Sequence, residues 1–327
     1  MSLLKAAISR TPFYLTTDQA RIVNSSSFPK TYINEEGKAI KIQAYFNGSV
    51  VAFKDKLLFC CRGDQKPWFK NIRLIFCELD DEFQPKKNTA RYLEVGSNLD
   101  TKGPNGEFHV EDPRLFVCGG SLHLVYGDGY EVYHAVFKDD LTVEKWRNIT
   151  NFSIQIKGND GREKNWCPFD YEGNPYFIYA DNPRVVWSPF RKQAILSNQN
   201  LEWEYGPIRG GTPAIKYGDS YIAFFHSALN LKGGESEWQN GRLYYMGAYV
   251  FESKPPFRVT HITKHPIMRG DGYHKNPQHQ GILEVVFPAG VVESNDSFFV
   301  SMGINDGCTG VIRVSKYLLQ AILSPLK

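Results

Sequence analysis

Four consecutive residues, Glu111-Asp112-Pro113-Arg114, place two carboxylates and a guanidinium at the start of a predicted strand. Proline fixes its own φ and biases the preceding residue toward an extended backbone, so that the Asp112 carboxylate projects from a rigid strand start. We interpret Asp112 as a general acid that burial and the neighbouring charge of Glu111 keep protonated. The alternative is an aspartate that hydrogen-bonds the turn backbone, with Arg114 as its salt-bridge partner.

Five further side chains have the chemistry of an anion site. Cationic and phenolic groups that converge on one point hold phosphates and sugar phosphates, and the sequence offers Arg62, Lys164, Lys216, His226 and Tyr245. The alternatives are a solvated lysine at Lys216, which lies beside a turn, and a hydrogen-bonded strand-end histidine at His226. Because no group of histidines, cysteines and carboxylates has the spacing of a strong metal site, we expect no metal.

The elements that position these residues follow one recurring pattern. An apolar strand, a tight polar turn, an aromatic-rich strand and a polar cluster occur five times, with the turns centred on Asp55, Gly119, Gly173, Gly218 and Asn295. Strands that alternate apolar and polar residues on both sides of such turns predict β-hairpins. Each interval also has room for two more strands, so we expect four antiparallel strands, repeated five times.

This repeat predicts an all-β protein built as a five-bladed β-propeller, with a two-sheet sandwich as the alternative. We find no linker and expect a single domain over residues 1–327, with short helices over 3–9 and 317–323. The expected blades span residues 42–85, 108–150, 163–205, 210–260 and 284–316. Because the first strands of all blades line the central channel, we expect their starting residues to meet at one mouth.

Composition sets limits on partners and location. The chain has 38 basic and 35 acidic side chains, a formal net charge of +3, and its lysines and arginines are dispersed. We therefore expect neither a nucleic-acid nor a membrane partner, while a homo-oligomer stays open. The six cysteines form no C-x-x-C pair, and five of them lie in apolar, strand-like runs. Buried, reduced thiols of this kind predict a cytoplasmic protein.

In combination, these residues resemble glycoside hydrolase family 130, the β-mannoside phosphorylases and their hydrolase relatives. The matching pieces, in chain order, are Asn47-Gly48-Ser49, Arg62, Glu111-Asp112-Pro113-Arg114, Lys164-Asn165-Trp166, Gly211-Thr212-Pro213-Ala214-Ile215-Lys216, Phe225-His226, Tyr245-Met246-Gly247-Ala248, Phe287-Pro288-Ala289-Gly290 and Asp306. Each piece is short, but they recur in order over nearly the whole chain. The resemblance implies a five-bladed propeller that acts on β-mannosides with inversion.

The resemblance also implies roles for individual residues, with Asp112 as the catalytic acid. The substrate would be bound by Asn47, Ser49, Arg62, Glu111, Arg114, Lys164, Asn165, Asp181 and Asp306, and phosphate by Lys216, His226 and Tyr245. Tyr244 would replace Tyr245 if the strand register differs by one residue. The substrate would be an oligosaccharide or a sugar phosphate, with inorganic phosphate as a co-substrate and no cofactor.

One stretch departs from the family pattern. The phosphorylases typically carry His-Arg-Pro where this sequence has Tyr179-Ala180-Asp181, which removes a cation from the expected phosphate site and adds a carboxylate. Phosphate needs no base to act as a nucleophile, whereas water requires a second carboxylate across the sugar. An inverting hydrolase with Asp181 or another carboxylate as its base, or a related mannosyltransferase, therefore stays open beside phosphorolysis. The remaining alternatives are a non-catalytic sugar-binding propeller and a family 43-like glycosidase on the same fold.

Overall fold

The computed structural model describes residues 14–33, 37–65, 70–95, 109–150, 163–230, 242–271 and 283–326. The helix expected over residues 3–9 lies outside these ranges. The helix expected over 317–323 is present as α2 (Lys316–Ile322), which begins where the Ser315 hydroxyl accepts a hydrogen bond from the Leu318 amide. Two short 3₁₀ turns, η1 (Thr17–Gln19) and η2 (Ser25–Ser27), are the other helical segments of the described ranges. The prediction of an all-β protein with little helix is confirmed.

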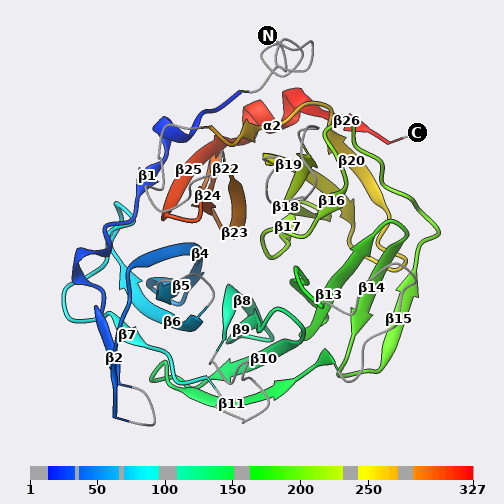
Figure 1. Ribbon diagram of the computed structural model, residues 1–327. Helices are drawn as coiled ribbons and strands as arrows, with labels where there is room; N and C mark the ends of the chain where they lie inside the picture. The colour runs from blue at the N-terminus through cyan, green and yellow to red at the C-terminus, as the bar shows by residue number, and fades with distance from the viewer. Residues whose placement is uncertain are drawn as a thin grey trace.

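Four antiparallel sheets of four strands each lie around a common centre (Figure 1). The first contains β4 (Ala44–Phe53), β5 (Lys56–Gln65), β6 (Lys70–Leu79) and β7 (Arg91–Tyr92). The second contains β8 (Glu111–Cys118), β9 (Ser121–Gly127), β10 (Val132–Phe137) and β11 (Val143–Asn148). The third contains β12 (Cys167–Tyr171), β13 (Asn174–Asp181), β14 (Arg184–Ser188) and β15 (Gln193–Leu196). The fourth contains β23 (Val286–Glu293), β24 (Ser297–Ile304), β25 (Cys308–Ser315) and β1 (Arg21–Ile22).

A larger sheet of eight strands completes the ring in Figure 1. Its strands are β16 (Ile208–Arg209), β17 (Ile215–Tyr217), β18 (Ser220–Asn230), β19 (Arg242–Glu252), β20 (Val259–Thr263), β21 (Met268–Arg269), β22 (Leu283–Glu284) and β26 (Leu323–Pro325). The predicted count of five four-stranded blades is therefore wrong: the described residues form four, and the expected blade 210–260 belongs to the larger sheet. The physical reason is the length of β18 and β19, 11 residues each, whose edges pair with several short segments. A further two-stranded sheet joins β2 (Thr31–Ile33) to β3 (Ala39–Lys41).

All five predicted hairpins are present, as the pairs β4–β5, β8–β9, β12–β13, β17–β18 and β23–β24. Strands β4, β8 and β23 lie nearest the centre of the ring, and β11 and β15 lie at its periphery (Figure 1). The first strands of these three hairpins therefore lie on the inner side of the ring, which is the arrangement that the turn pattern predicts.

Side-chain hydroxyls connect the inner strands of neighbouring sheets. The Ser49 hydroxyl on β4 accepts a hydrogen bond from the Leu115 amide on β8 at 2.9 Å, and the Ser301 hydroxyl on β24 accepts one from the Val50 amide at 3.0 Å. Apolar clusters fill the space between the sheets; one of them packs Phe224 of β18 with Val300 of β24. These contacts fix the spacing of the inner strands and hence of the residues at their ends.

Two sheets are completed by segments from the two ends of the described chain. β1 pairs with the outer edge of β25, and β26 pairs with β20 at the edge of the eight-stranded sheet. All six cysteines are unpaired and five are buried, so the prediction of free, buried thiols is confirmed. Within the described ranges, no helix has both the length and the apolar character needed to cross a membrane.

Candidate active site

Several residues at the mouth of the channel have a left-handed backbone, among them Asn47, Asp112, Asn165 and Asp306, with φ of 50°, 52°, 61° and 48°. Few residues other than glycine adopt such angles, and asparagine and aspartate do so most readily. The extended backbone that the following proline predicts for Asp112 is therefore wrong. A register shift interrupts the β8–β9 ladder between Glu111 and Arg114, and this bulge accommodates the turn of the chain at Asp112.

The bulge has a direct chemical consequence. Consecutive residues of a regular strand point to opposite faces of the sheet. Glu111 and Asp112 are consecutive, yet both carboxylates reach the same guanidinium, that of Arg62 on β5. The backbone of β8 thus brings two adjacent acids to one side of the mouth.

Arg62 is the centre of this arrangement, and its side chain is 4% exposed. Its Nε and Nη2 donate to the two oxygens of Asp64 at 3.0 and 2.9 Å. Its Nη1 donates to Glu111 Oε2 at 2.8 Å and to Asp112 Oδ1 at 3.4 Å. One cation therefore holds three carboxylates. We call Asp64, Glu111, Asp112 and Asp306 the acidic cluster.

Asp306 belongs to this cluster because its charge interacts with all the other members. Burial raises the pKa of Asp306 to about 6; Arg62 opposes that rise, and Asp112, Asp64 and Glu111 add to it. Glu111 behaves in the opposite way. Burial disfavours its charged form, but Arg62 and then the hydrogen bond from His109, whose Nε2 lies 3.0 Å from Oε2, lower the pKa of Glu111 to about 2. The cluster therefore contains an ionised carboxylate beside a carboxyl that keeps its proton to near pH 6.

Asp112 is the most exposed of the three carboxylates that Arg62 binds. Its side chain is 18% exposed, against 15% for Glu111 and 0% for Asp64. The Asn47 side-chain amide donates to Asp112 Oδ1 at 2.8 Å. Asp112 is thus held in place by Asn47 and Arg62 while part of its carboxyl group stays open to a ligand.

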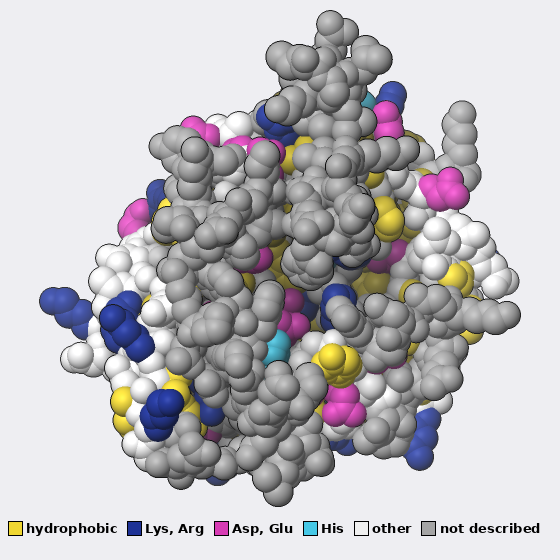
Figure 2. All heavy atoms as spheres, viewed as in Figure 1, with side chains coloured by type: hydrophobic (Ala, Val, Ile, Leu, Met, Phe, Trp, Pro, Cys, Tyr) yellow, Lys and Arg dark blue, Asp and Glu magenta, His cyan; other side chains and the backbone are white. Residues whose placement is uncertain are grey.

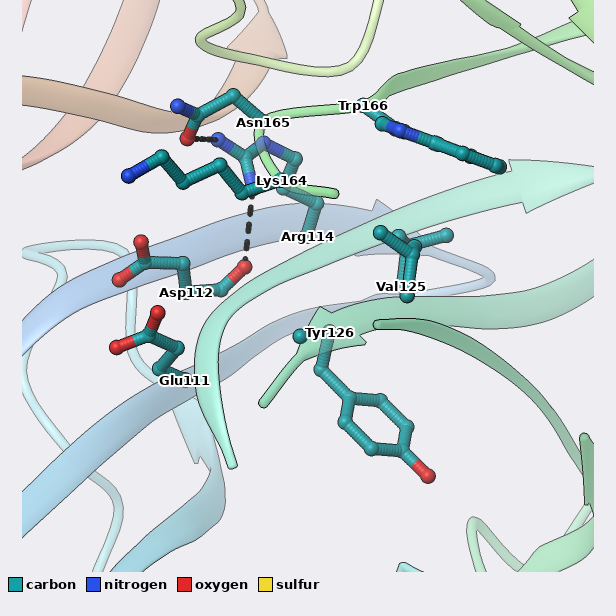
Figure 3. A pocket seen from close by; sticks show the side chains of 10 residues that line it. Glu111, Asp112, Arg114, Val125, Tyr126, Lys164, Asn165 and Trp166 are labelled. Carbon is teal, nitrogen blue, oxygen red and sulfur yellow. Dashed lines mark hydrogen bonds between the residues drawn. The ribbon is translucent and has the colours of Figure 1, made fainter. Parts of the chain in front are cut away.

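Arg114 does not form the salt bridge with Asp112 that we considered. Its Nη1 donates to the main-chain carbonyl of Asp112 at 3.0 Å, its Nε to the Gly211 carbonyl at 2.7 Å, and its Nη2 to Asn165 Oδ1 at 3.3 Å (Figure 3). The guanidinium is therefore bound entirely to neutral oxygens. These hydrogen bonds link the mouth ends of three sheets. No carboxylate of the described residues neutralises the positive charge of Arg114.

A hollow beside these residues is lined by Glu111, Asp112, Arg114, Lys164, Asn165 and Trp166 among others. In Figure 3 the Lys164 side chain runs past Arg114, with its amine on the same side as the two carboxylates. Figure 2 shows acidic, basic and histidine side chains gathered at the centre of this face. The hollow therefore offers both a carboxylic acid and a free ammonium group to a polar ligand.

His226 lies on β18 at the same end of the channel and is 2% exposed. Its ring is parallel to that of Tyr244, with centroids 6.1 Å apart, and packs on Phe287 at 4.7 Å. Burial, then the charges of Arg209 and Arg114, lower the pKa of His226 to about 3, so the ring is neutral. Its Nδ1 is buried and has no hydrogen-bond partner in the described protein.

Tyr244, and not Tyr245, lies beside His226. The β18–β19 register pairs His226 with Met246 and Ala228 with Tyr244, which places His226 and Tyr244 on the same face of the sheet. Tyr245 faces the other way and packs on Tyr205, with centroids 5.3 Å apart. The register therefore places Tyr244, and not Tyr245, on the face of the sheet that carries His226.

Lys216 lies at the opposite end of the channel. It sits on β17 beside the hairpin turn, and its amine is 3.9 Å from the centroid of the Tyr221 ring. It lines a cavity of about 580 Å³ together with turn-proximal residues that include Val117, Glu172 and Glu293. The structure does not bring Lys216 to His226.

Two residues that were predicted to bind the substrate, Ser49 and Asp181, form hydrogen bonds or ion pairs with other protein groups. The Ser49 side chain is fully buried, and its hydroxyl holds the Leu115 amide. Asp181 is buried and pairs with Arg184, which also donates to the Tyr249 hydroxyl at 3.2 Å. Burial raises the pKa of Asp181, and Arg184 opposes that rise. Asp181 therefore compensates a buried arginine rather than joining the acidic cluster.

Sequence reasoning missed several members of the site. Those with direct contacts to predicted residues are Asp64, His109 and Arg209. Asp64 follows Arg62 by two residues and so lies on the same face of β5, a spacing that could have revealed the pair. His109 has the same spacing to Glu111. The position of Arg209 depends on the two-residue strand β16, which has no sequence signal of its own.

Comparison with known proteins identifies the family of the chain. The family profile described as beta-1,4-mannooligosaccharide phosphorylase matches residues 16–323, which is nearly the whole chain. The chain belongs to glycoside hydrolase family 130. A curated relative of this family 130 protein, beta-1,2-mannobiose phosphorylase of Thermoanaerobacter sp. (strain X514), is 27% identical over 122 residues. That alignment covers 37% of this chain and 36% of the relative, so the chain spans about a third of the length of the relative it matches.

Solved structures show the same fold. The beta-1,2-mannobiose phosphorylase from Listeria innocua, in complex with beta-1,2-mannobiose, has a TM-score of 0.60 at 16% identity and covers 92% of this chain and 99% of that one. A structure from work on family 130 glycoside hydrolases that target beta-1,2 mannosidic linkages in Candida mannan has a TM-score of 0.64 at 14% identity. It covers 92% of each chain. Phosphorylases and hydrolases thus share the architecture of this family 130 member.

Proposed function

We propose that this protein is a mannoside phosphorylase that cleaves a β-mannosidic bond with inversion, using Asp112 as the general acid. The observation that carries the proposal is the division of charge at the mouth. The acidic cluster is grouped around Arg62, whereas Arg114, Lys164 and Arg209 form no ion pair with a carboxylate of the described residues. We call these three residues the cationic group.

The chemistry of the acidic cluster supports the proposal that this part of the mouth binds the sugar. A mannose ring offers several hydroxyl groups, and ionised carboxylates and amides at fixed positions are the usual partners of such groups. Arg62, Asn47 and the bulge in β8 hold Asp112 at a defined angle without enclosing it. A general acid needs this combination of fixed geometry and access to the leaving oxygen.

The cationic group supports phosphate as the nucleophile. Among the described residues, the side chains of Lys164 and Arg209 form no ion pair and no hydrogen bond, and the Arg114 guanidinium binds only neutral oxygens. Uncompensated cations beside a polar hollow favour a ligand that brings its own negative charge. Water as the nucleophile would instead need a second carboxylate on that side, and Asp181 is occupied by Arg184.

The reaction balances with these groups alone. Asp112 gives its proton to the glycosidic oxygen, which leaves with the shortened saccharide as an alcohol. A phosphate oxygen attacks the anomeric carbon from the opposite face and forms α-mannose 1-phosphate. The proton that Asp112 loses is recovered from solvent when the products leave. A single protein carboxyl group therefore suffices.

The test is incubation with β-1,2- and β-1,4-linked mannobiose, with and without inorganic phosphate, followed by phosphorus and proton NMR. We expect α-mannose 1-phosphate to form only when phosphate is present. Release of free mannose at the same rate without phosphate would favour the hydrolase alternative. No turnover with either disaccharide, combined with saccharide binding that Asp112→Asn leaves intact, would favour the non-catalytic alternative.

We further propose that the ring of sheets is a single catalytic domain and that the enzyme acts in the cytoplasm. The shared inner-strand hydrogen bonds support the first point, and the six unpaired cysteines support the second. Its substrates are then an oligosaccharide and inorganic phosphate.

A further inference from the structure

The cavity at the turn end of the channel is distinct from the hollow beside Asp112. Its volume is about 580 Å³, and the first strands of all five hairpins line it, through residues that include Val51, Leu115, Phe169, Ile215 and Val291. Cavities of roughly 300–1,000 Å³ with mostly apolar walls and a few polar groups are typical of small-molecule sites. The cavity therefore has the size and the lining of a ligand site.

The walls of this cavity run from an exposed rim to a fully buried floor. Val117 on β8 is 36% exposed, whereas Leu115, two residues earlier on the same strand, is 1% exposed. Phe169 on β12 is also fully buried. A molecule with an apolar body that enters past Val117 would cover apolar surface, and the removal of such surface from water favours binding.

The rim is held in place by hydrogen bonds within the protein. Asp170 Oδ2 accepts a hydrogen bond from the Gly119 amide at 2.9 Å, and its Oδ1 accepts one from the Gly173 amide at 2.8 Å. The Tyr221 hydroxyl donates to the main-chain carbonyl of Asp170 at 2.5 Å. One residue thus joins the turn after β8, the turn after β12 and strand β18. The cavity is therefore preformed, which reduces the loss of entropy when a ligand binds.

The acidic side chains that line the cavity already have partners. The Asp170 carboxylate accepts the two amides described above, and Glu293 forms an ion pair with Lys316. Burial, and then a hydrogen bond with Glu172, raise the pKa of the Tyr171 hydroxyl. These carboxylates are therefore occupied by groups of the protein.

Lys216 differs from these acids. Its ammonium group lies 3.9 Å from the centroid of the Tyr221 ring, and it forms no hydrogen bond and no ion pair with the described residues. An ammonium group has three N–H donors, and a ring face satisfies them only weakly. A carboxylate is the partner that would form charge-assisted hydrogen bonds with this group.

We propose that this cavity is a second ligand site, which binds a small monocarboxylate with an apolar body. The carboxylate binds Lys216, and the apolar body lies between the strands against residues such as Leu115 and Phe169. The site takes no part in the cleavage of mannosides, because Asp112 lies at the start of β8 and the cavity lies at its other end. Free saccharides fit poorly, since their hydroxyl groups need several polar partners that an apolar cavity lacks.

The test is calorimetric titration of the whole protein with 2-naphthoate, which combines a carboxylate with an apolar ring system. We expect Lys216→Met to raise its Kd about tenfold, because a charge-assisted contact is lost. Lys216→Arg keeps the charge and should stay within about threefold of the unchanged protein. The matched control is Lys145→Met, which removes an exposed lysine from the peripheral strand β11 and should leave the Kd unchanged.

Two further probes separate the contributions of charge and of the apolar body. Acetate keeps the carboxylate without the ring system, and 2-naphthol keeps the ring system without the carboxylate. We expect both to bind more weakly than 2-naphthoate, and we expect Lys216→Met to leave the Kd of 2-naphthol unchanged. Equal Kd values of 2-naphthoate for Lys216→Met and the unchanged protein would overturn the proposal, as would the absence of any binding at millimolar concentration.

A second variant locates the binding without changing a charge. Val117→Trp places an indole at the rim of the cavity and should raise the Kd of 2-naphthoate at least tenfold, because the ring excludes the ligand. Leu196→Trp is its control, since Leu196 is exposed on the peripheral strand β15. Mannobiose and phosphate should leave the Kd unchanged; competition by either, or full binding by Val117→Trp, would place the ligand elsewhere. Melting temperatures establish that each variant is folded.

Discussion

The acidic cluster and the cationic group occupy the same mouth, but they handle charge in opposite ways. Arg62 compensates Asp64, Glu111 and Asp112 through four hydrogen bonds, so these three carboxylates have a partner without a ligand. Arg114, Lys164 and Arg209 have no carboxylate partner among the described residues. The difference indicates that the acidic cluster orients a neutral ligand, whereas the cationic group binds a negatively charged one.

Removing the carboxyl group of Asp112 from the acidic cluster is the strongest test of this difference. We expect Asp112→Asn to lower kcat by about 10²- to 10⁴-fold, because general acid catalysis is lost while Asn47 and Arg62 keep their positions. Steady-state rates with mannobiose measure the loss. A 4-nitrophenyl β-mannoside, whose leaving group needs no proton, should lose much less.

Glu172→Gln is the matched control for Asp112→Asn, since Glu172 is an exposed carboxylate at the opposite end of the channel. Its kcat should match that of the unchanged protein. An Asp112→Asn variant within tenfold of the original kcat would remove Asp112 from the role of acid.

Asp181 provides a second test, because it is a buried acid that belongs to neither the acidic cluster nor the cationic group. Asp181→Asn leaves the Arg184 charge uncompensated, so we expect the free energy of unfolding to fall by about 3 kcal/mol. Urea denaturation measures this change. The kcat of the folded fraction should stay within about twofold. A collapse of kcat with unchanged stability would instead identify Asp181 as the base of a hydrolase.

Two lysines at opposite ends of the channel sharpen the comparison further. Lys164→Met should raise the phosphate KM by about tenfold, because a charge-assisted contact is lost. Lys216→Met should leave it unchanged, since Lys216 lies over the Tyr221 ring in the other cavity. Initial rates at varied phosphate concentration measure both variants. Equal effects would show that charge acts over the whole channel and not within one mouth.

The smallest expected effect concerns Asp306. Its pKa of about 6 in the folded protein lies above the usual value of 3.8, so burying its charge costs free energy above pH 6 and costs nothing below pH 4. Asp306→Asn should therefore raise the free energy of unfolding by about 1 kcal/mol at pH 8, with the gain vanishing toward pH 4. The loss of attraction to Arg62 keeps the gain this small. Denaturation at both pH values measures it, and a variant that is less stable at pH 8 would contradict it.

The sequence predicts the hairpins well because each depends on local information. Turn residues such as those around Asp55 and Gly119 punctuate alternating strands, and the pairs form where the pattern places them. The eight-stranded sheet could not be predicted. Its extra members, such as β16, β22 and β26, are two or three residues long and pair with strands that are distant in sequence.

The candidate site was predictable in composition but not in detail. Asp112 lies near the start of β8, and it meets Asn47 and Arg62 at the register shift of the β4–β5 ladder. The choice between Tyr244 and Tyr245 depends on a one-residue register, which alternation alone does not define. Lys216 was misplaced because β17 begins only at Ile215, so that the lysine lies near the turn and not near the mouth.

The two segments that complete sheets from the ends of the described chain have a consequence for handling the protein. β25 and β20 would each expose a row of unpaired backbone groups if β1 or β26 were removed. Such edges can recruit the equivalent segment of a second molecule, which is the route to exchange of strands between copies and to aggregation. Fusion tags at either end should therefore be joined through flexible linkers that leave residues 14–22 and 316–326 free to dock.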